Sequence, residues 1–143
     1  MEIDRNGLEV LRREDCLRLL ASATLGRIAI TAGALPTVLP VNFRLVGDQI
    51  VFRTGAGTKL DAATQNAVVA FEVDDIDPVW HTGWSVVVTG VAREVTEPDE
   101  LTRIEVSSIP HWAPDRADRI VAISTEIITG RRIPSGVRAL PAR

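Results

Sequence analysis

A short segment of the sequence combines residue types that bind phosphate. Arg53, Thr54, Thr58 and Lys59 flank the turn 55–57, whose sequence is Gly-Ala-Gly. We expect a strand before this turn and a short helix after it. Outward-pointing N–H groups at a helix N-terminus, together with two cations and two hydroxyls, match the oxygens of a phosphate monoester. A glycine turn with solvated charges explains the same residues equally well, so both interpretations stay open at this point.

Two familiar nucleotide motifs do not fit this segment. The Rossmann pattern needs a third glycine where Leu60 stands, and the Walker pattern needs four residues between its glycines before the lysine. Lys59 is nevertheless the only lysine among sixteen basic residues. Codon bias in a GC-rich genome explains the excess of arginine, while a compact lysine charge also suits a phosphate oxygen.

Other reactive residue types lack partners at a useful spacing. The four carboxylates between Glu72 and Asp77 fit no calcium loop, so they indicate a solvated turn rather than a metal site. His81 and His111 are far apart in the chain, and Cys16 lies on the apolar stripe of an expected helix. Because no catalytic triad or carboxylate pair is evident, an enzyme with this sequence would rely on a bound cofactor.

Composition limits the class of protein. The chain has 143 residues, an apolar share of 45% and a net charge of −3, which indicates one globular domain and gives no basic surplus for nucleic acid. Apolar runs are too short to span a membrane. A single cysteine excludes an internal disulfide, and the charged residues at 1–5 indicate no secretory signal. We therefore expect a cytoplasmic protein that binds neither nucleic acid nor membrane.

The hydrophobic pattern predicts a mainly β domain over 13–133, after a loose lead-in at 1–12 and before a frayed tail at 134–143. Helical spacing predicts short helices that begin near Arg13, Thr58 and Thr96. Alternating apolar residues predict strands at 27–31, 35–45, 49–54, 67–73, 84–95 and 120–133, with an acidic turn at 74–78 and a kink or bulge at Gly90. Hairpin connections between such strands favour a closed antiparallel barrel.

Two kinds of residue indicate where this barrel meets a partner. Pro36 and Pro40 share one face of the second expected strand, and proline cannot donate to a strand ladder, so we expect an edge strand that meets something other than another strand. Trp80, Trp84 and Trp112 fall at expected loops or strand starts. They either close the barrel ends or a subunit interface, or one of them lies against a planar ligand.

Five segments in this order resemble the flavin-binding split barrels of the pyridoxamine 5'-phosphate oxidase-like family, over about residues 13–133. They are LGR at 25–27, PVNF at 40–43, the phosphate segment at 53–59, AFEVD at 70–74 and GWSVVVTG at 83–90. The chain looks most like the small, single-domain actinobacterial branch. This resemblance implies a six-stranded antiparallel split β-barrel with short flanking helices, and a homodimer that binds FMN in two grooves at the subunit interface.

The resemblance also implies roles for individual residues. The phosphate segment would hold the FMN phosphate, and the stretch Val38–Phe43 would run along the isoalloxazine ring, mainly through its backbone. Ser85 would touch the ring system, Trp84 would flank the ring or the ribityl chain, and Trp112 would cover the site from the partner subunit. The implied cofactor-binding residues are Val38, Pro40, Val41, Asn42, Phe43, Arg53, Thr54, Thr58, Lys59, Trp84, Ser85 and Trp112.

The implied activity is that of an oxidoreductase in which hydride passes through the flavin, with no catalytic side chain identified and no metal. The chain lacks the long insertions of the biosynthetic oxidase, so vitamin B6 oxidation is not implied and the substrate stays unknown. Related barrels use a deazaflavin or bind haem. The alternatives are therefore a deazaflavin-dependent reductase or carrier, and a flavin- or haem-binding module without turnover.

Overall fold

Alternating burial along the strands explains most of the fold in the computed structural model, which describes residues 1–106 and 118–134. In β7, for example, Val69, Phe71 and Val73 are buried while their neighbours face outward, as the two-residue period of a strand requires. The strands are β1 (Glu2–Ile3), β2 (Glu9–Val10), β3 (Leu25–Ala32), β4 (Leu35–Asn42), β5 (Arg44–Val46), β6 (Gln49–Gly55), β7 (Ala67–Asp77), β8 (Thr82–Glu94), β9 (Asp118–Ser124) and β10 (Ile127–Arg132). The helices are α1 (Arg13–Ser22), α2 (Lys59–Ala63) and α3 (Pro98–Val106).

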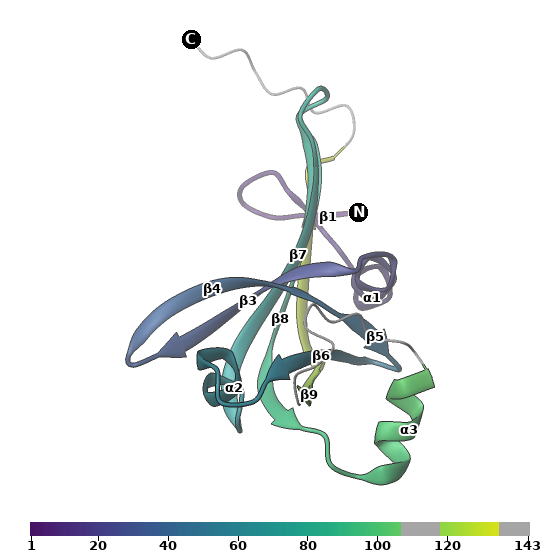
Figure 1. The fold of residues 1–143 in the computed structure, drawn as a ribbon. Helices are drawn as coiled ribbons and strands as arrows, with labels where there is room; N and C mark the ends of the chain where they lie inside the picture. Colours follow the sequence, from purple (N-terminus) through teal and green to yellow (C-terminus); the bar gives the residue numbers. More distant parts are fainter. Residues whose placement is uncertain (107–117, 135–143) are drawn as a thin grey trace.

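A ring of antiparallel strands forms the barrel. The ring closes because the strand expected at 35–45 is divided into β4 and β5, which pair with different strands. β4 pairs with β3 along its whole length, and after a break at Phe43 the chain continues as β5, which pairs with β6. From β6 the pairing runs to β9, β8 and β7 and returns to β3. With β4 and β5 counted as one strand, the expected six-stranded split barrel is confirmed (Figure 1).

β8 is also shared between two partners, since its first part pairs with β10 and its last part with β9. The kink or bulge expected at Gly90 does not interrupt the pairing with β7, whose register with β8 is continuous from Ala67 to Asp77. On the other side of β8 the register shifts by one residue between Thr89–Ile127 and Ala92–Ile123. Gly90 lies where β8 changes partner, and a Cβ added there would come within 3.1 Å of the Ser124 carbonyl oxygen. Glycine therefore permits a close backbone approach at this position.

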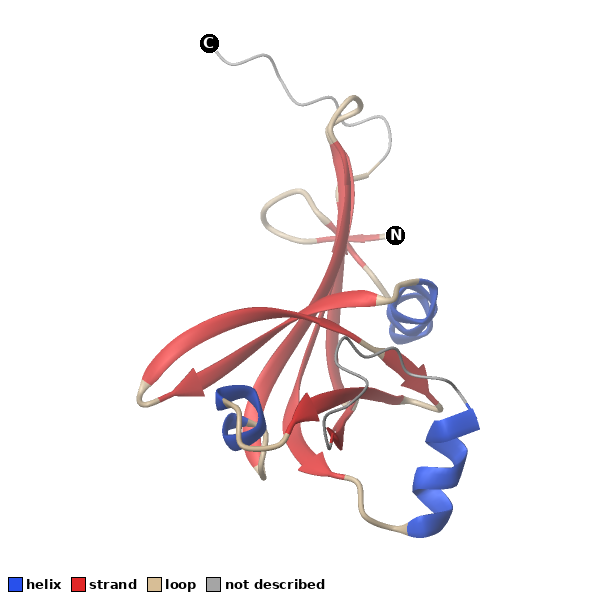
Figure 2. Cartoon of the chain, viewed as in Figure 1, coloured by secondary structure: helices blue, strands red, loops and turns tan. Residues whose placement is uncertain are grey.

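The interior of the barrel is one apolar cluster. The rings of Phe43 and Phe71 meet edge to face with their centroids 4.9 Å apart, and Leu20 and Cys16 from α1 pack against the same cluster. A smaller cluster lies on the outside of β6 and β9, where Ile104 of α3 covers them. Figure 2 shows the helices at the margins of the strands, and the strands supply most of the buried residues of both clusters.

Two segments expected as loops are strands. The expected acidic turn at 74–78 was wrong, since β7 continues through Asp77. The lead-in at 1–12 is also more ordered than expected, because β1 and β2 form a hairpin that pairs with β10. Arg131 Nε on β10 donates to Asp4 Oδ2 over 2.9 Å, which fastens this hairpin to the sheet. Of the expected tail at 134–143, only Pro134 lies within the described residues.

The paired ends of β7 and β8 extend beyond the barrel as an arm, residues 75–83. Figure 1 shows this arm rising above the remaining strands. At its tip, the Asp77 carboxylate accepts the N–H groups of Val79 and Trp80, and the Trp80 side chain is 73% exposed. The arm thus gives the molecule a long ribbon with two open faces.

Candidate functional site

The turn between β6 and α2 is organised around a buried carboxylate. Asp61, 3% exposed, accepts the Gly57 N–H over 2.8 Å and the Thr54 hydroxyl over 3.2 Å. The Thr58 hydroxyl donates to the Gly55 carbonyl and accepts the Asp61 N–H, so Thr58 is the N-cap of α2. These bonds fix the shape of the turn.

Both threonines of the phosphate segment therefore use their hydroxyls inside the protein. Thr54 is 2% exposed and faces the barrel interior. Arg53 lies on the opposite face of β6, where its cross-strand partner is Ile120, and Lys59 is exposed as the first residue of α2. The arrangement gives a rigid turn with a cationic side chain on either side of it, which suits an anion outside the turn.

Asp61 carries its negative charge within this turn. The hydrogen bond from the Gly57 N–H is the main cause of a lowered Asp61 pKa, and Arg119 and Thr54 lower it further. Arg119 Nε lies 3.6 Å from Asp61 Oδ1 and its guanidinium also reaches Glu94. Asp61 is thus ionised at neutral pH and holds the turn by charge-assisted bonds.

Sequence reasoning missed Asp61 and Arg119. Asp61 stands three positions after Thr58, which is the spacing of a capping box, and that spacing would have identified it. Arg119 comes from β9, far away in the sequence, and only the β6–β9 pairing brings it to the turn. No local pattern indicates a contact of that kind.

β4 offers a free backbone edge beside this turn. Among the described strands it pairs with β3 on one side only, which confirms the expected edge strand. Pro36 and Pro40 lack an N–H, so they occupy positions that point away from β3, and Val38 between them must point the same way. The Val38 N–H and C=O are therefore directed outward, and the Val38 side chain is 62% exposed.

Other members of the 38–43 stretch face the barrel interior. The side chains of Val41 and Phe43 are buried in the core cluster, Val41 pairs with Gly26 of β3, and the Phe43 N–H donates to the Thr24 carbonyl oxygen. Asn42 has the same orientation along β4 as Val38. Val38, Pro40 and Asn42 therefore lie on the outer face of the sheet.

The outer face of β4, β3, β7, β8 and β10 is a continuous surface. Cross-strand register aligns Val38, Ala29, Ala70, Thr89 and Ile127 in one row across the five strands. Several large apolar side chains on this face are exposed, namely Leu25, Val38, Val68, Val91 and Ile127. Such an apolar face is typical of a surface that another molecule covers.

Charged residues lie in the middle of this face. Arg27 donates to both Glu72, over 3.1 Å, and Asp74, over 2.6 Å. Burial raises the pKa of Glu72, and the nearby Asp74 raises it further. The single cation between two carboxylates leaves this group with a net negative charge.

Ser85 and Trp84 point to opposite faces of β8. Ser85 pairs with Asp74 and Arg131 on the outer face, where it lines a cavity of about 610 Å³ with both of them. Trp84 points to the inner face and packs against the barrel core with Val86, although it also lines the edge of this cavity. The two residues expected to contact one ring system thus lie on different sides of the sheet, and only Ser85 shares a face with Val38 and Pro40.

The phosphate segment and Ser85 lie far apart within one chain. Arg53 pairs with Ile120, whose carbonyl accepts the Val95 N–H. Val95, the first residue after β8, follows Ser85 by ten positions, which corresponds to roughly 30 Å of extended chain. Trp112 lies outside the described residues, so its expected place over the site stays a prediction.

The described residues show two further properties of the chain. No group of three or more potential metal ligands is found among them, because alternation along β7 sends Asp74 to one face and Asp75 and Asp77 to the other. No described helix has the length and apolar composition needed to cross a membrane.

Comparison with known proteins identifies the family. The profile of the pyridoxamine 5'-phosphate oxidase family matches residues 12–132. The chain is 42% identical over 133 residues to the uncharacterized protein Rv0080 of Mycobacterium tuberculosis, covering 90% of this chain and 87% of that protein. Among solved structures, the FAD binding protein from Mycobacterium smegmatis is similar, with a TM-score of 0.78, 36% identity, and coverage of 88% of this chain and 100% of that one.

A second solved structure gives the same result. The putative pyridoxamine 5'-phosphate oxidase from Corynebacterium glutamicum has a TM-score of 0.75 and 31% identity, and covers 87% of this chain and 97% of that chain. The matched profile spans every strand of the barrel from β3 to β10. The chain therefore belongs to the pyridoxamine 5'-phosphate oxidase family.

Proposed function

We propose that this protein is a flavin-binding oxidoreductase that holds FMN between the two subunits of a homodimer. The observation that carries the proposal is the free edge of β4, where the Val38 backbone points outward between two prolines beside an apolar sheet face. The similar Mycobacterium smegmatis structure is that of a protein named for binding FAD. This likeness supports a flavin nucleotide as the class of ligand.

The donor set of the described residues fits a flavin mononucleotide. Lys59 and Arg53 are the cations that would balance the phosphate charge, while Asp61, Thr54 and Thr58 keep the turn in shape from behind. The Val38 N–H and C=O provide one donor and one acceptor, which match the polar edge of a planar ring. These residues supply binding and orientation, not a proton donor with an evident role.

A second subunit is needed to complete this site. Ser85 lies roughly 30 Å of strand away from the row of Arg53, and a mononucleotide is shorter than that distance. We therefore assign the ring contact to Ser85 of the partner subunit. Burial of the exposed apolar residues on the outer face supplies the driving force for the homodimer.

The chemistry follows from this arrangement. A bound flavin supplies hydride transfer, since the described residues offer no nucleophile or acid–base pair of their own. Val38 and Pro40 set the position of the ring on the sheet, and the apolar residues around them exclude water from it. We place the activity in the cytoplasm, because the single cysteine, Cys16, is buried and free and needs no oxidising compartment.

Reconstitution with candidate cofactors tests the proposal. The purified protein is titrated with FMN, FAD, riboflavin, a deazaflavin and haem, and binding is followed by absorbance and by quenching of flavin fluorescence. We expect FMN to bind with one flavin per chain, and riboflavin, which lacks the phosphate, to bind at least about tenfold more weakly. Preference for deazaflavin or haem over every flavin would contradict the assignment of the cofactor.

A further inference from the structure

A cavity on the inner side of the arm adjoins the cavity beside Ser85, and the two share all of their arm residues except Asp75 and His81. It has a volume of about 440 Å³ and is lined by residues of the arm together with Trp84, Arg132 and Ile133. Asp75 shows on which face of the arm the cavity lies. It pairs across the strands with Trp84, which pairs with Arg132, so these three side chains share the inner face. This face is opposite to the one that carries Ser85 and Val38.

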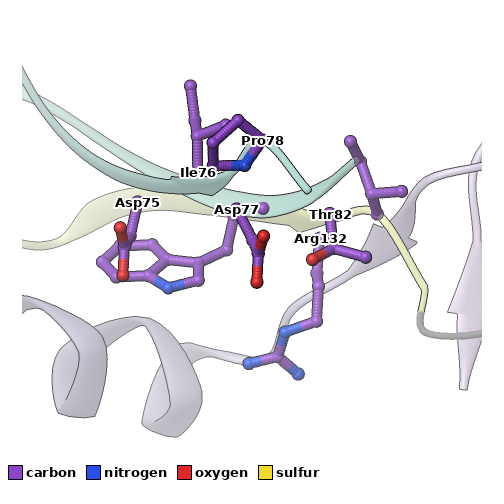
Figure 3. A pocket seen from close by; sticks show the side chains of 9 residues that line it. Asp75, Ile76, Asp77, Pro78, Thr82 and Arg132 are labelled. Atoms are coloured by element: carbon purple, nitrogen blue, oxygen red, sulfur yellow. The ribbon is translucent and has the colours of Figure 1, made fainter. Parts of the chain in front are cut away.

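The cavity is lined by charged and apolar side chains and by one aromatic ring, that of Trp84. Figure 3 shows the carboxylates of Asp75 and Asp77 on the same side of the arm as Arg132, with Ile76 and Pro78 turned to the other side. Trp84 stands between Asp75 and Arg132 in the cross-strand row. Its indole packs against the barrel core, which fixes the ring in place.

The charge available to a ligand in this cavity is negative. Arg132 lies 3.7 Å from the Glu9 carboxylate of the N-terminal hairpin, so its charge is already balanced. The Asp77 carboxylate accepts two backbone N–H groups at the arm tip. Asp75 and Asp77 therefore add two negative charges beside an indole ring, and Arg132 is the only cation among the residues that line the cavity.

We propose that this cavity binds a small organic cation, such as a quaternary or protonated amine with a compact apolar body. A cation is attracted both to the face of an indole ring and to the two carboxylates. The volume is within the range of small-molecule sites. Water screens the exposed carboxylates, so the affinity is expected to be in the millimolar range.

This inference goes beyond the proposed flavin function and does not depend on it. None of the residues on which it rests belongs to the turn around Asp61, although Asp77, Trp84 and Arg132 also line the adjoining cavity beside Ser85. A protein that binds flavin but no amine, or an amine but no flavin, would separate the two proposals.

A fluorescence titration tests the inference directly. Trp80→Phe and Trp112→Phe together leave Trp84 as the single tryptophan, and this variant is titrated with choline, with its neutral carbon isostere 3,3-dimethylbutanol and with inorganic phosphate. We expect a saturable change with choline, and binding at least about fivefold weaker for the neutral isostere. Equal affinity for choline and the neutral alcohol, or no saturation with choline, would overturn the proposal.

Carboxylate variants separate the cavity from general surface charge. Asp75→Asn and Asp77→Asn keep the size of the side chains, and the amide oxygen introduced by Asp77→Asn can still accept the turn hydrogen bonds, so the fold should persist. We expect each to weaken choline binding, with a larger loss for the double variant. Asp48→Asn, a carboxylate at the remote β5–β6 turn, is the matched control and should bind choline like the parent; an equal loss in this control would refute a specific site.

Discussion

At the scale of single residues, the proposed phosphate site combines a buried aspartate, which holds the turn in shape, with two cations, which would bind the phosphate. Asp61 binds the Gly57 N–H and the Thr54 hydroxyl and so keeps the turn rigid. Lys59 and Arg53 carry the positive charge on either side of it. The sequence-based interpretation assigned all four segment residues to the phosphate, whereas the hydrogen bonds assign the threonines to the turn itself.

The role of Asp61 predicts a characteristic pH dependence. Its folded pKa is lowered, mainly by the Gly57 N–H, from a usual value of 3.8. The carboxylate therefore contributes stability that is complete above about pH 5 and is lost as pH falls through 3.8 toward the lower folded value. Asp61→Asn should lower the free energy of unfolding by about 1 kcal/mol at pH 7, and by less at pH 3, as measured by urea denaturation. An undiminished difference at pH 3 would contradict an ionised Asp61.

Removal of the two cations should weaken the ligand without harming the fold. The double variant Arg53→Ala, Lys59→Ala should bind FMN at least about tenfold more weakly, because a charge-assisted hydrogen bond contributes roughly 1.5–3 kcal/mol. Its affinity for riboflavin should change little, since riboflavin has no phosphate. The matched control, Arg5→Ala, removes an exposed cation far from the turn. Unchanged FMN affinity in the double variant would exclude this segment as the phosphate site.

At the scale of the elements, the fold depends on a glycine where β3 crosses a phenylalanine ring. A Cβ added at Gly26 would lie 2.4 Å from the Phe71 ring, and the Phe71 side chain is fully buried in the core. Gly26→Ala should therefore destabilise the protein by about 1–3 kcal/mol, the usual cost of overpacking. Chemical denaturation of the variant gives this value.

A compensating substitution checks the cause of that loss. Phe71→Leu removes the ring that the new methyl group would meet, so Gly26→Ala should cost less in the Phe71→Leu background than alone. A double-mutant cycle measures the difference. Additive losses would show that the cost of Gly26→Ala arises from the backbone and not from contact with Phe71.

The sequence predicted the strands better than their boundaries. Alternation of Val69, Phe71 and Val73 was sufficient to identify β7, and the prolines at 36 and 40 identified the edge. The acidic residues after Val73 resembled a turn because charge is common in loops, yet they alternate between two solvated faces of the arm. The pairing of the N-terminal hairpin with β10 depends on contacts between distant residues, such as Asp4 with Arg131, which local patterns do not encode.

At the scale of the whole molecule, our proposal completes the candidate site with a second copy of the chain. The residues expected to bind one cofactor fall into two groups, one at the turn after β6 and one at the root of the arm. Local sequence motifs identified each group but gave no information about their separation. Their distance along β8, together with the apolar outer face, is what requires the homodimer in our proposal.

Charges introduced on the outer face should therefore separate the subunits. Val68→Arg with Ile127→Arg places two cations among apolar residues that the dimer would bury, and an unpaired buried charge is costly. We expect the variant to have the mass of one 15.5 kDa chain by light scattering, and the parent to have twice that mass. Leu35→Arg is the matched control, since Leu35 is 69% exposed but points to the other face of its strand. A dimeric double variant would exclude this face as the interface.

The most direct test of the account is a crystal structure of the protein grown with FMN. We predict two subunits joined through their outer faces, the flavin ring against the free edge of β4 at Val38, and the phosphate within hydrogen-bonding distance of the Lys59 ammonium group. Flavin density at any other surface, or a phosphate remote from Lys59 in a structure that contains the flavin, would contradict the account.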